Sequence, residues 1–240
     1  MKYVILTGAS GGIGHRLTKD LLREDLDRVV VAIYNRNKPV HNGFGDVHGD
    51  RLITQQLDVA DAGAVLAWAR DLKFAPWAVI NMHGVTMNAM HWKATGADEA
   101  NLLETNLLGT MNMCAALAPL MREAGGGRVI NVSSVVARAG AIGCSAYAAS
   151  KGGVEAYTRA IALELARKRV TANSVALGYM ELGMTETMPD SVLADTLERV
   201  PLNRLGTISE VAALVEYLLG DHSAYMTGQT LQLNGGLSLG

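Results

Sequence analysis

This chain of 240 residues has few cysteines, a small net charge and no long apolar runs. Its two cysteines, Cys114 and Cys144, lie in no cluster with the further Cys or His that zinc requires. Two cysteines also cannot make a disulfide framework, so we expect a cytoplasmic protein without a metal site. The 21 Lys and Arg nearly balance the 23 Asp and Glu, and the formal net charge of −2 excludes a global basic field for nucleic acid.

We also find no membrane-spanning segment and no export signal in the sequence. No run of 18 apolar residues occurs, so no membrane-spanning helix is predicted. The first residues form a strand-like KYVILTG without a charged segment before a long apolar one, and we expect no signal peptide. With 49% apolar and 18% charged residues, the composition is that of a globular chain, and a single domain over residues 1–240 is favoured.

Short apolar runs rich in β-branched residues alternate with longer helical patterns. The strand-like runs begin at Tyr3, Val29, Leu52, Ala78, Arg128, Val170 and Thr230. The helical patterns begin near Gly12, Asp61, Glu99, Ala146 and Ser209. This alternation predicts a Rossmann-type, doubly wound α/β fold with a mostly parallel seven-stranded sheet flanked by helices. The long insertion from Met180 to Val200 fits either a lid or a pair of surface helices.

A glycine-rich stretch, TGASGGIG, follows the first strand and leads into the first helix. Glycines allow a sharp turn and a close approach of the backbone to a pyrophosphate, while the helix N-terminus supplies N–H donors and a favourable dipole. The position between strand and helix favours a dinucleotide site over an ordinary turn. The cofactor contacts predicted here are Gly8, Ser10, Gly11, Gly12, Ile13 and Gly14.

The end of the second strand reads IYNRNKP and contains no carboxylate. A site selective for NAD usually places an acidic residue about 20 residues past the glycines, where it binds the ribose 2′-hydroxyl. Asn35 and Arg36 stand there instead, and a guanidinium is a good partner for a 2′-phosphate. NADP(H) is therefore the predicted cofactor, and a polar turn with solvated charges is the alternative.

The stretch SAYAASKGG spaces Tyr147 and Lys151 four residues apart among small residues. A free tyrosine, with a pKa of about 10, is a poor acid or base at neutral pH. On a helix the two residues share a face, so the ammonium could lie beside the phenol and favour its ionised form. Seen alone, the spacing also fits a lysine stem packed on an aromatic ring.

Several motifs in one order, over essentially the whole chain, resemble those of the short-chain dehydrogenase/reductase family. The glycine pattern matches the family's TGxxxGxG, and Tyr147 begins its YxxxK thirteen residues after Ser134. The other matching segments are LDV at 57–59, TNLLGT at 105–110, INVSS at 130–134 and MTGQTLQLNGG at 226–236. Among subfamilies, the chain is most similar to the 3-oxoacyl-[acyl-carrier-protein] reductases, which are ketoreductases.

The resemblance implies a catalytic group of four residues. Tyr147 would give a proton to a carbonyl oxygen, and Ser134 would hold that oxygen. Lys151 would bind the nicotinamide ribose and stabilise the tyrosinate, and Asn106 would tie a water to Lys151. Besides the glycine turn, the implied cofactor contacts are Asn35, Arg36, Asp58, Val59, Asn81, Gly84, Tyr147, Lys151, Gly178 and Met180.

The chain departs from the family pattern beside the implied cofactor. The family's NNAG is NMHG here, at residues 81–84, which introduces His83. This residue is either a functional imidazole or a bulky replacement that local repacking accommodates. Leu182 stands where a threonine commonly binds the nicotinamide carboxamide, and Thr185 or the backbone near Met180 are the expected substitutes.

The implied substrate is a carbonyl compound, either a small molecule or the 3-oxoacyl group of an acyl-carrier protein, as in fatty-acid biosynthesis. Residues 167–169, Arg-Lys-Arg, could present a cationic patch to an acidic carrier near the active-site mouth, although a solvated basic helix end is the alternative. A dehydrogenase of a small secondary alcohol, sugar or polyol is a second possibility. An NADP-binding sensor without turnover is a third, and the four intact catalytic positions argue against it.

The family commonly forms homotetramers through two long helices. The segment LLETNLLGTMNMCAALAPLM, residues 102–121, has more apolar surface than one face of a sheet needs. We therefore expect a homotetramer in which this surface packs on a partner helix.

Overall fold

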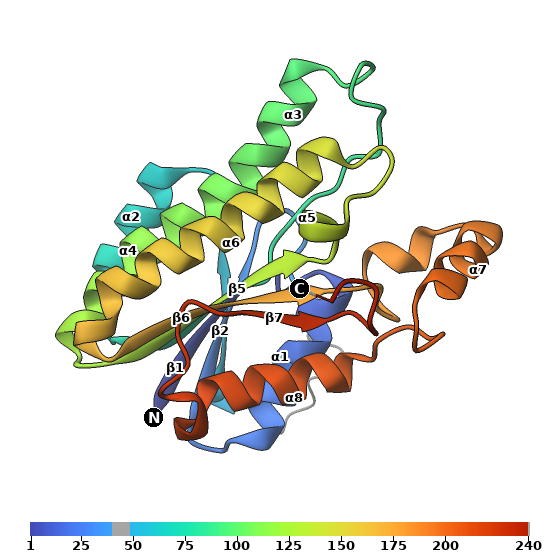
Figure 1. Ribbon diagram of the computed structural model, residues 1–240. Coiled ribbons are helices and arrows are strands. Elements are labelled where there is room, and N and C mark those ends of the chain that lie inside the picture. Colours follow the sequence, from blue (N-terminus) through green and yellow to red (C-terminus); the bar gives the residue numbers. More distant parts are fainter. Residues whose placement is uncertain (40–48, 240) are drawn as a thin grey trace.

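The computed structural model describes residues 1–39 and 49–239, which contain a seven-stranded parallel sheet (Figure 1). The strand order is β3-β2-β1-β4-β5-β6-β7. The strands are β1 (Lys2–Thr7), β2 (Arg28–Tyr34), β3 (Leu52–Gln56), β4 (Pro76–Asn81), β5 (Gly127–Ser134), β6 (Val170–Leu177) and β7 (Thr230–Leu233). Each predicted strand is present, and every neighbouring pair is parallel, so the predicted fold class is confirmed.

Helices cover both faces of the sheet, with α1 and α8 on one face and α2, α4 and α6 on the other (Figure 1). The α-helices are α1 (Gly12–Glu24), α2 (Ala62–Asp71), α3 (Gly96–Leu103), α4 (Gly109–Glu123), α5 (Val136–Ala139), α6 (Ser145–Leu165), α7 (Asp190–Arg199) and α8 (Ile208–Leu219). The shorter turns are the 3₁₀ helices η1 (Gly49–Arg51), η3 (Ala166–Lys168), η4 (Met184–Thr187) and η5 (Asp221–Ser223), and the π-helical turn η2 (Glu104–Leu108). Within the described ranges, no helix combines the length and apolar character needed to cross a membrane.

Alternate residues of each strand face opposite sides of the sheet, so the sheet has a hydrophobic core on each face. In β1, Val4 and Leu6 pack in the core that contains Leu21 of α1. Ile5, between them, packs in the core that contains Leu117 of α4. Because both faces are buried, the central strands read as continuous apolar runs, which is the pattern that made them recognisable in the sequence.

The strand order reverses at β1, which lies between β2 and β4. The chain moves outward from β1 to β3 and then returns to the other side of β1 at β4. The connections that leave β1 and β4 therefore diverge, and an α/β sheet has its ligand crevice at such a point, beyond the carboxyl ends of the strands. Thr7, Asn81 and Ser134 end three of these strands and so meet at this edge.

Side-chain caps fix where several helices begin. Asp61 accepts a hydrogen bond from Ala64 N, 2.9 Å away, and starts α2 as predicted. Thr207 and Glu210 form a reciprocal capping box at the start of α8, so this helix begins just before the predicted Ser209. Between α3 and α4 the helix is interrupted by η2, a π-helical turn that the sequence pattern did not predict.

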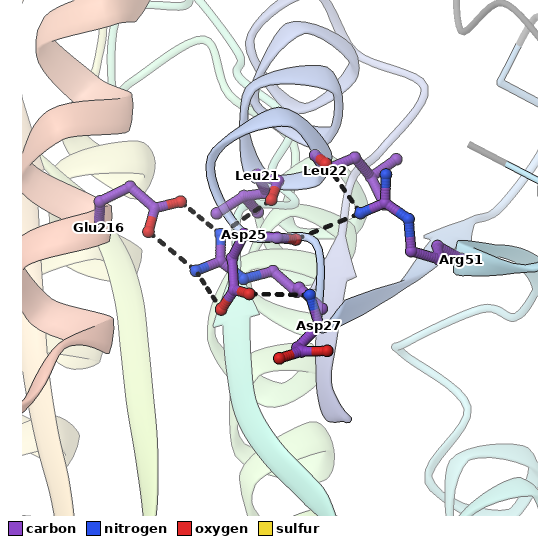
Figure 2. Close-up of polar contacts among 7 residues, drawn as sticks. Leu21, Leu22, Asp25, Asp27, Arg51 and Glu216 are labelled. Atoms are coloured by element: carbon purple, nitrogen blue, oxygen red, sulfur yellow. Dashed lines mark hydrogen bonds and ion pairs between the residues drawn. The ribbon is translucent and has the colours of Figure 1, made fainter. Parts of the chain in front are cut away.

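At the amino end of the sheet, opposite the crevice, charged side chains fasten α1, β2 and α8 together (Figure 2). Arg28 begins β2, and its guanidinium makes a bidentate ion pair with Glu216 of α8. The Arg28 Nη1 also donates to the Leu21 carbonyl oxygen at 2.9 Å, and Arg51 donates to the Leu22 carbonyl oxygen at 2.9 Å. These carbonyls belong to the last turn of α1, where cations satisfy acceptors that lack a helical partner.

Candidate active site

The glycine turn between β1 and α1 presents a helix N-terminus that no side chain caps. Gly8 has a φ of 71°, and a Cβ on it would lie 2.8 Å from the Cα of His83. A Cβ on Gly14 would collide with the carbonyl oxygen of Gly8. Gly11 precedes α1 and offers no side-chain acceptor to its first N–H groups. The turn therefore provides both the space and the donors that an anionic pyrophosphate needs.

A cavity of about 900 Å³ extends from this turn along the carboxyl edge of the sheet. The predicted cofactor residues that line it are Gly8, Ser10, Gly11, Gly12, Ile13, Gly14, Asn35, Arg36, Asp58, Val59, Gly84, Tyr147, Lys151, Gly178 and Met180. The predicted catalytic Ser134 lines the same cavity. These residues come from segments far apart in the chain, and the cradle of small residues fits a nicotinamide dinucleotide.

One end of the cavity is formed by the turns that follow β2 and β3. Asn35 and Arg36 line it, and Gln56 Nε2 donates to the Asn35 carbonyl oxygen at 2.8 Å. In the next turn the Asp58 carboxylate accepts from Ala60 N at 3.0 Å. Hydrogen bonds thus order both turns, and the exposed Arg36 lies at the rim where the 2′-phosphate is predicted.

Tyr147 and Ser134 face each other in the cavity from α6 and β5. Burial raises the pKa of Tyr147, and its hydrogen bond with Ser134 works against that rise. The Ser134 Oγ accepts a hydrogen bond from Val136 N at 3.3 Å. A hydroxyl carries one proton and two acceptor sites, so Ser134 can donate to the phenol or to a ligand oxygen in the same place.

Lys151 is buried beside Tyr147, with 3% of its surface exposed. Its Nζ donates to the Val132 carbonyl oxygen at 2.9 Å and lies 5.9 Å from the centroid of the Tyr147 ring. Burial lowers the pKa of Lys151 to about 8. The pair therefore lies inside the cavity rather than on an exposed helix face, and at neutral pH the lysine carries its charge next to the phenol.

Asn106 lies behind the cavity, in the π-helical turn η2, and does not line it. Its Oδ1 accepts from Val85 N at 2.8 Å, and its Nδ2 donates to the Val85 carbonyl oxygen at 2.9 Å and to Ser150 Oγ at 3.1 Å. A Cβ on Gly84 would lie 3.4 Å from both Asn106 Oδ1 and Lys151 Nζ. Asn106 thus fixes the backbone beside Lys151, while the water it is expected to hold stays a prediction.

Asn81 is the one predicted cofactor residue that the structure keeps out of the cavity. Its side chain is buried between β4, β5 and α4, where Nδ2 donates to Asn131 Oδ1 at 2.8 Å and lies 3.4 Å from Cys114 Sγ. The reason is the alternation along β4, which turns this position toward the core on the α4 side. The Asn81 side chain thus joins two strands and does not line the cavity, and the cofactor contact expected of this residue stays a prediction.

The start of the insertion after β6 covers the glycine turn. A Cβ on Gly12 would lie 3.0 Å from both Glu186 Oε2 and Gly183 N. Glu186 Oε2 accepts from Gly183 N at 2.6 Å, which closes the η4 turn. Leu182 and Thr185 both line the cavity. Thr185, expected to replace the missing carboxamide partner, is therefore within the cavity, and its role stays a prediction.

Glu155 is a buried residue near the site that sequence reasoning missed. It lies one turn after Lys151 on α6 and is 4% exposed. Its carboxylate accepts from Ser133 Oγ at 2.9 Å and from Arg138 Nε at 3.2 Å. These contacts tie α5 and β5 to α6 directly behind the catalytic pair. A glutamate four residues after Lys151 on the inner face of the helix was the available signal.

The basic segment 167–169 lies at the other end of α6 from Tyr147. The helix between them has 21 residues, which corresponds to a length of about 30 Å. Within one chain this segment therefore lies far from Tyr147, which favours the solvated basic helix end, and the cationic patch for a carrier stays a prediction. Among the described residues, no group of three or more His, Cys, Asp or Glu side chains is placed to hold a metal ion.

Comparison with known proteins agrees with this fold. The family model described as enoyl-(acyl carrier protein) reductase matches residues 8–238. The 3-oxoacyl-[acyl-carrier-protein] reductase FabG of Vibrio harveyi is 33% identical over 236 residues, which are 98% of this chain and 97% of that protein. The FabG of Pseudomonas aeruginosa is 32% identical over 241 residues, 98% of this chain and 97% of its own. Nodulation protein G of Rhizobium sp. (strain N33) is 31% identical over 239 residues, 98% of this chain and 96% of its own.

A doubly wound parallel sheet with a glycine cradle and a Ser-Tyr-Lys cavity defines an oxidoreductase that uses a nicotinamide cofactor. The matches place the chain more narrowly, since they extend over nearly its whole length. The chain belongs to the short-chain dehydrogenase/reductase family, as its motifs predicted.

Proposed function

We propose that this protein reduces the 3-oxo group of an acyl thioester to a secondary alcohol with NADPH, and that the acyl group is carried by an acyl-carrier protein. The observation that carries the proposal is the position of Ser134, Tyr147 and the buried Lys151 in the same cavity as the glycine cradle. Two hydroxyls that meet at one point suit an oxygen that accepts a proton. The 3-oxoacyl thioester is supported by the names of the relatives from Vibrio harveyi and Pseudomonas aeruginosa.

The residues of this chain divide the chemistry among them. When bound, NADPH supplies the hydride that reduces the carbonyl carbon. Tyr147 gives its proton to the carbonyl oxygen, and Ser134 donates a hydrogen bond that holds this oxygen near the phenol. Burial raises the pKa of Tyr147, and the hydrogen bond with Ser134 works against that rise. The positive charge of Lys151 stabilises the tyrosinate that is left after proton transfer.

The preference for NADPH over NADH rests on Arg36. This cation lines the rim of the cavity after β2, beside the ordered Asn35 backbone. A guanidinium at this place pairs with a 2′-phosphate but gains little from a 2′-hydroxyl. We accordingly assign NADP(H) as the cofactor.

The position of the basic segment bears on how a carrier protein would dock. Because residues 167–169 lie about 30 Å from Tyr147 along α6, they can meet a carrier at this active site only from another subunit. The exposed Leu163 on α6 and the half-exposed Leu108 at the end of η2 offer apolar surface for subunit contacts. The homotetramer expected from the family resemblance, and the cytoplasmic location expected from the scarcity of cysteine, stay part of this proposal.

A substrate panel with both cofactors tests the function. We expect acetoacetyl thioesters to be reduced with NADPH at least tenfold faster than with NADH, and Tyr147→Phe to lower kcat by about 10³ because the proton donor is lost. Tyr225→Phe, at a fully exposed tyrosine, is the matched control and should leave kcat unchanged.

Three outcomes would overturn the proposal. Turnover of a polyol with NAD but not of acetoacetyl thioesters would identify a small-alcohol dehydrogenase. Faster reduction of crotonyl thioesters would identify an enoyl reductase. NADPH binding without turnover of any substrate would indicate a sensor.

A further inference from the structure

His83 occupies a closed position at the junction of β1, β4 and η2. It follows β4 by two residues, lines the cavity and is 7% exposed. Its backbone packs so closely on the glycine turn that a Cβ on Gly8 would lie 2.8 Å from the His83 Cα. On the other side, a Cβ on Gly109 would lie 3.1 Å from His83 Nε2. Gly8 thus leaves room for the His83 backbone, and Gly109 leaves room for its imidazole.

The hydrogen bonds of Thr7 assign the proton on the imidazole. Thr7 Oγ1 lies 2.6 Å from His83 Nδ1 and accepts a hydrogen bond from Met82 N at 3.1 Å. The Thr7 hydroxyl has one proton, and its other acceptor, the Ile80 carbonyl oxygen, is 3.4 Å away. Met82 N and His83 N both donate to Thr7 Oγ1 and occupy its two acceptor sites, so Thr7 donates to Nδ1 and the ring carries its own proton on Nε2.

The Nε2–H faces the π-helical turn. Thr110 Oγ1 lies 3.4 Å from Nε2 and itself donates to the Asn106 carbonyl oxygen at 2.8 Å. Because the only proton of Thr110 is used in that bond, its hydroxyl can only accept from His83. The Thr105 backbone also accepts a hydrogen bond from His83. The imidazole therefore joins the last residue of β1 to the turn that carries Asn106.

The ring is neutral throughout the physiological range. Burial, together with the charge of nearby Lys151, lowers the pKa of His83 to about 3, although the hydrogen bond to Thr105 works in the other direction. A neutral ring can accept at one nitrogen while it donates at the other, which an imidazolium cannot do. Accepting from Thr7 at Nδ1 while donating from Nε2 requires this neutral form.

We propose that His83 is a positioning residue whose imidazole links the end of β1 to the π-helical turn that carries Asn106. Through the hydrogen bonds between Asn106 and Val85, the link holds the Gly84–Val85 backbone beside Lys151. The effect on turnover rests on the proposed reductase function, whereas the effect on the Val85 backbone does not. His83 is thus more than a bulky replacement accommodated by repacking.

Amide hydrogen exchange at Val85 tests the link without substrate. The Val85 N–H donates to Asn106 Oδ1, so its exchange reports whether Asn106 stays in place. His83→Asn keeps an acceptor at the Nδ1 position but is too short to reach Thr110, and His83→Gln reaches the Nε2 position. We expect His83→Asn to speed exchange at Val85 by about tenfold, and His83→Gln by less than about threefold.

Thr110→Val removes the acceptor for His83 together with the bond to the Asn106 carbonyl oxygen, so it should speed exchange at Val85 at least as much as His83→Asn, which keeps the test valid if that variant folds poorly. Ser223→Ala is the matched control, because it removes a buried hydroxyl at η5, far from the site. It should leave exchange at Val85 unchanged. Equal exchange at Val85 in His83→Asn, Thr110→Val and Ser223→Ala would overturn the proposal, as would a ¹⁵N spectrum with the His83 proton on Nδ1.

Turnover separates this proposal from the proposed function. With acetoacetyl thioester and NADPH, we expect His83→Asn to lower kcat by about tenfold, with NADPH affinity within about threefold of the wild type. His83→Gln should retain most of kcat. If Val85 responds as expected but the wild type reduces no acyl thioester, the reductase function is wrong and the positioning role stands. If kcat and NADPH affinity fall together in His83→Asn, the ring acts on the cofactor instead and the proposal is wrong.

Discussion

Lys151 and Arg28 are both buried cations, but they lie at opposite ends of the sheet and have different partners. Arg28, 5% exposed, lies at the amino end and pairs with Glu216. Lys151, 3% exposed, lies at the carboxyl end, donates to the Val132 carbonyl and makes no ion pair in the part of the chain that the structure describes. Of these two cations, Lys151 therefore keeps a charge that no carboxylate compensates, and it lies in the active-site cavity.

The presence or absence of a carboxylate partner gives these two buried cations different roles, one structural and one chemical. A buried cation with a bidentate carboxylate partner holds elements in register, and its field is largely neutralised. A buried cation without such a partner costs stability, but its charge acts on whatever enters the cavity. The amino end of the sheet thus fastens α1, β2 and α8, and the carboxyl end keeps a charge available for the phenol and for a bound ligand.

Replacing Lys151 tests whether its uncompensated charge supports the reaction, and we expect this substitution to have the largest effect. We expect Lys151→Met to lower kcat/KM for the proposed reduction by about 10³, because the tyrosinate loses its stabilising charge. The same variant should unfold in urea at a concentration no lower than the wild type, since a desolvated charge is removed. A loss of activity that is explained by a matching loss of stability would contradict the assignment, and Lys73→Met, at an exposed lysine, is the control.

Replacing Arg28 should have the opposite signature. Arg28→Met leaves Glu216, whose side chain is 26% exposed, without its partner and removes the donor to the Leu21 carbonyl. We expect the free energy of unfolding, measured in urea, to fall by about 2–4 kcal/mol, and kcat to stay within about twofold of the wild type.

A second substitution sharpens this result. Glu216→Leu in the Arg28→Met background removes the unpaired carboxylate, so part of the lost stability should return. If the double variant is less stable by the sum of both single losses, the two side chains do not act as a pair. If Arg28→Met lowers kcat as much as Lys151→Met does, the two ends of the sheet are not functionally distinct.

The site at the carboxyl end of the sheet was largely predictable, because its motifs are made of residues that lie close together in the sequence. The spacing of Tyr147 and Lys151 places both on one helix face, and the glycine turn follows directly from the end of β1. Strand ends meet at one edge of any parallel sheet, so residues after separate strands could be assigned to one cavity before the structure was known. Asn81 is the exception, because strand alternation turned its side chain into the core.

The ion pair at the amino end of the sheet, and the hydrogen bonds that hold the backbone behind the site, could not be predicted in this way. Arg28 and Glu216 are 188 residues apart, and no local pattern pairs them. Asn106 sits on a π-helical turn whose extra residue per turn shifts the direction of its side chain, so its bonds to the Val85 backbone were not foreseen. His83 was visible as a departure from the family pattern, but its partners lie on two other elements.

The pH dependence of stability provides the smallest and most direct test of the uncompensated charge. Burial lowers the pKa of Lys151 from 10.5 to about 8. Between pH 8 and 9 the unfolded chain keeps the proton on this lysine while the folded protein loses it, so the unfolded state binds more protons and stability rises with pH. We expect the free energy of unfolding to increase by about 1 kcal/mol over this interval, relative to Lys151→Met measured under the same conditions. Well below pH 8 both states are protonated, so this dependence on pH should vanish and the difference between the two proteins should become constant. A flat difference from pH 7 to 9 would mean that another group compensates the charge of Lys151, and the contrast with Arg28 would then disappear.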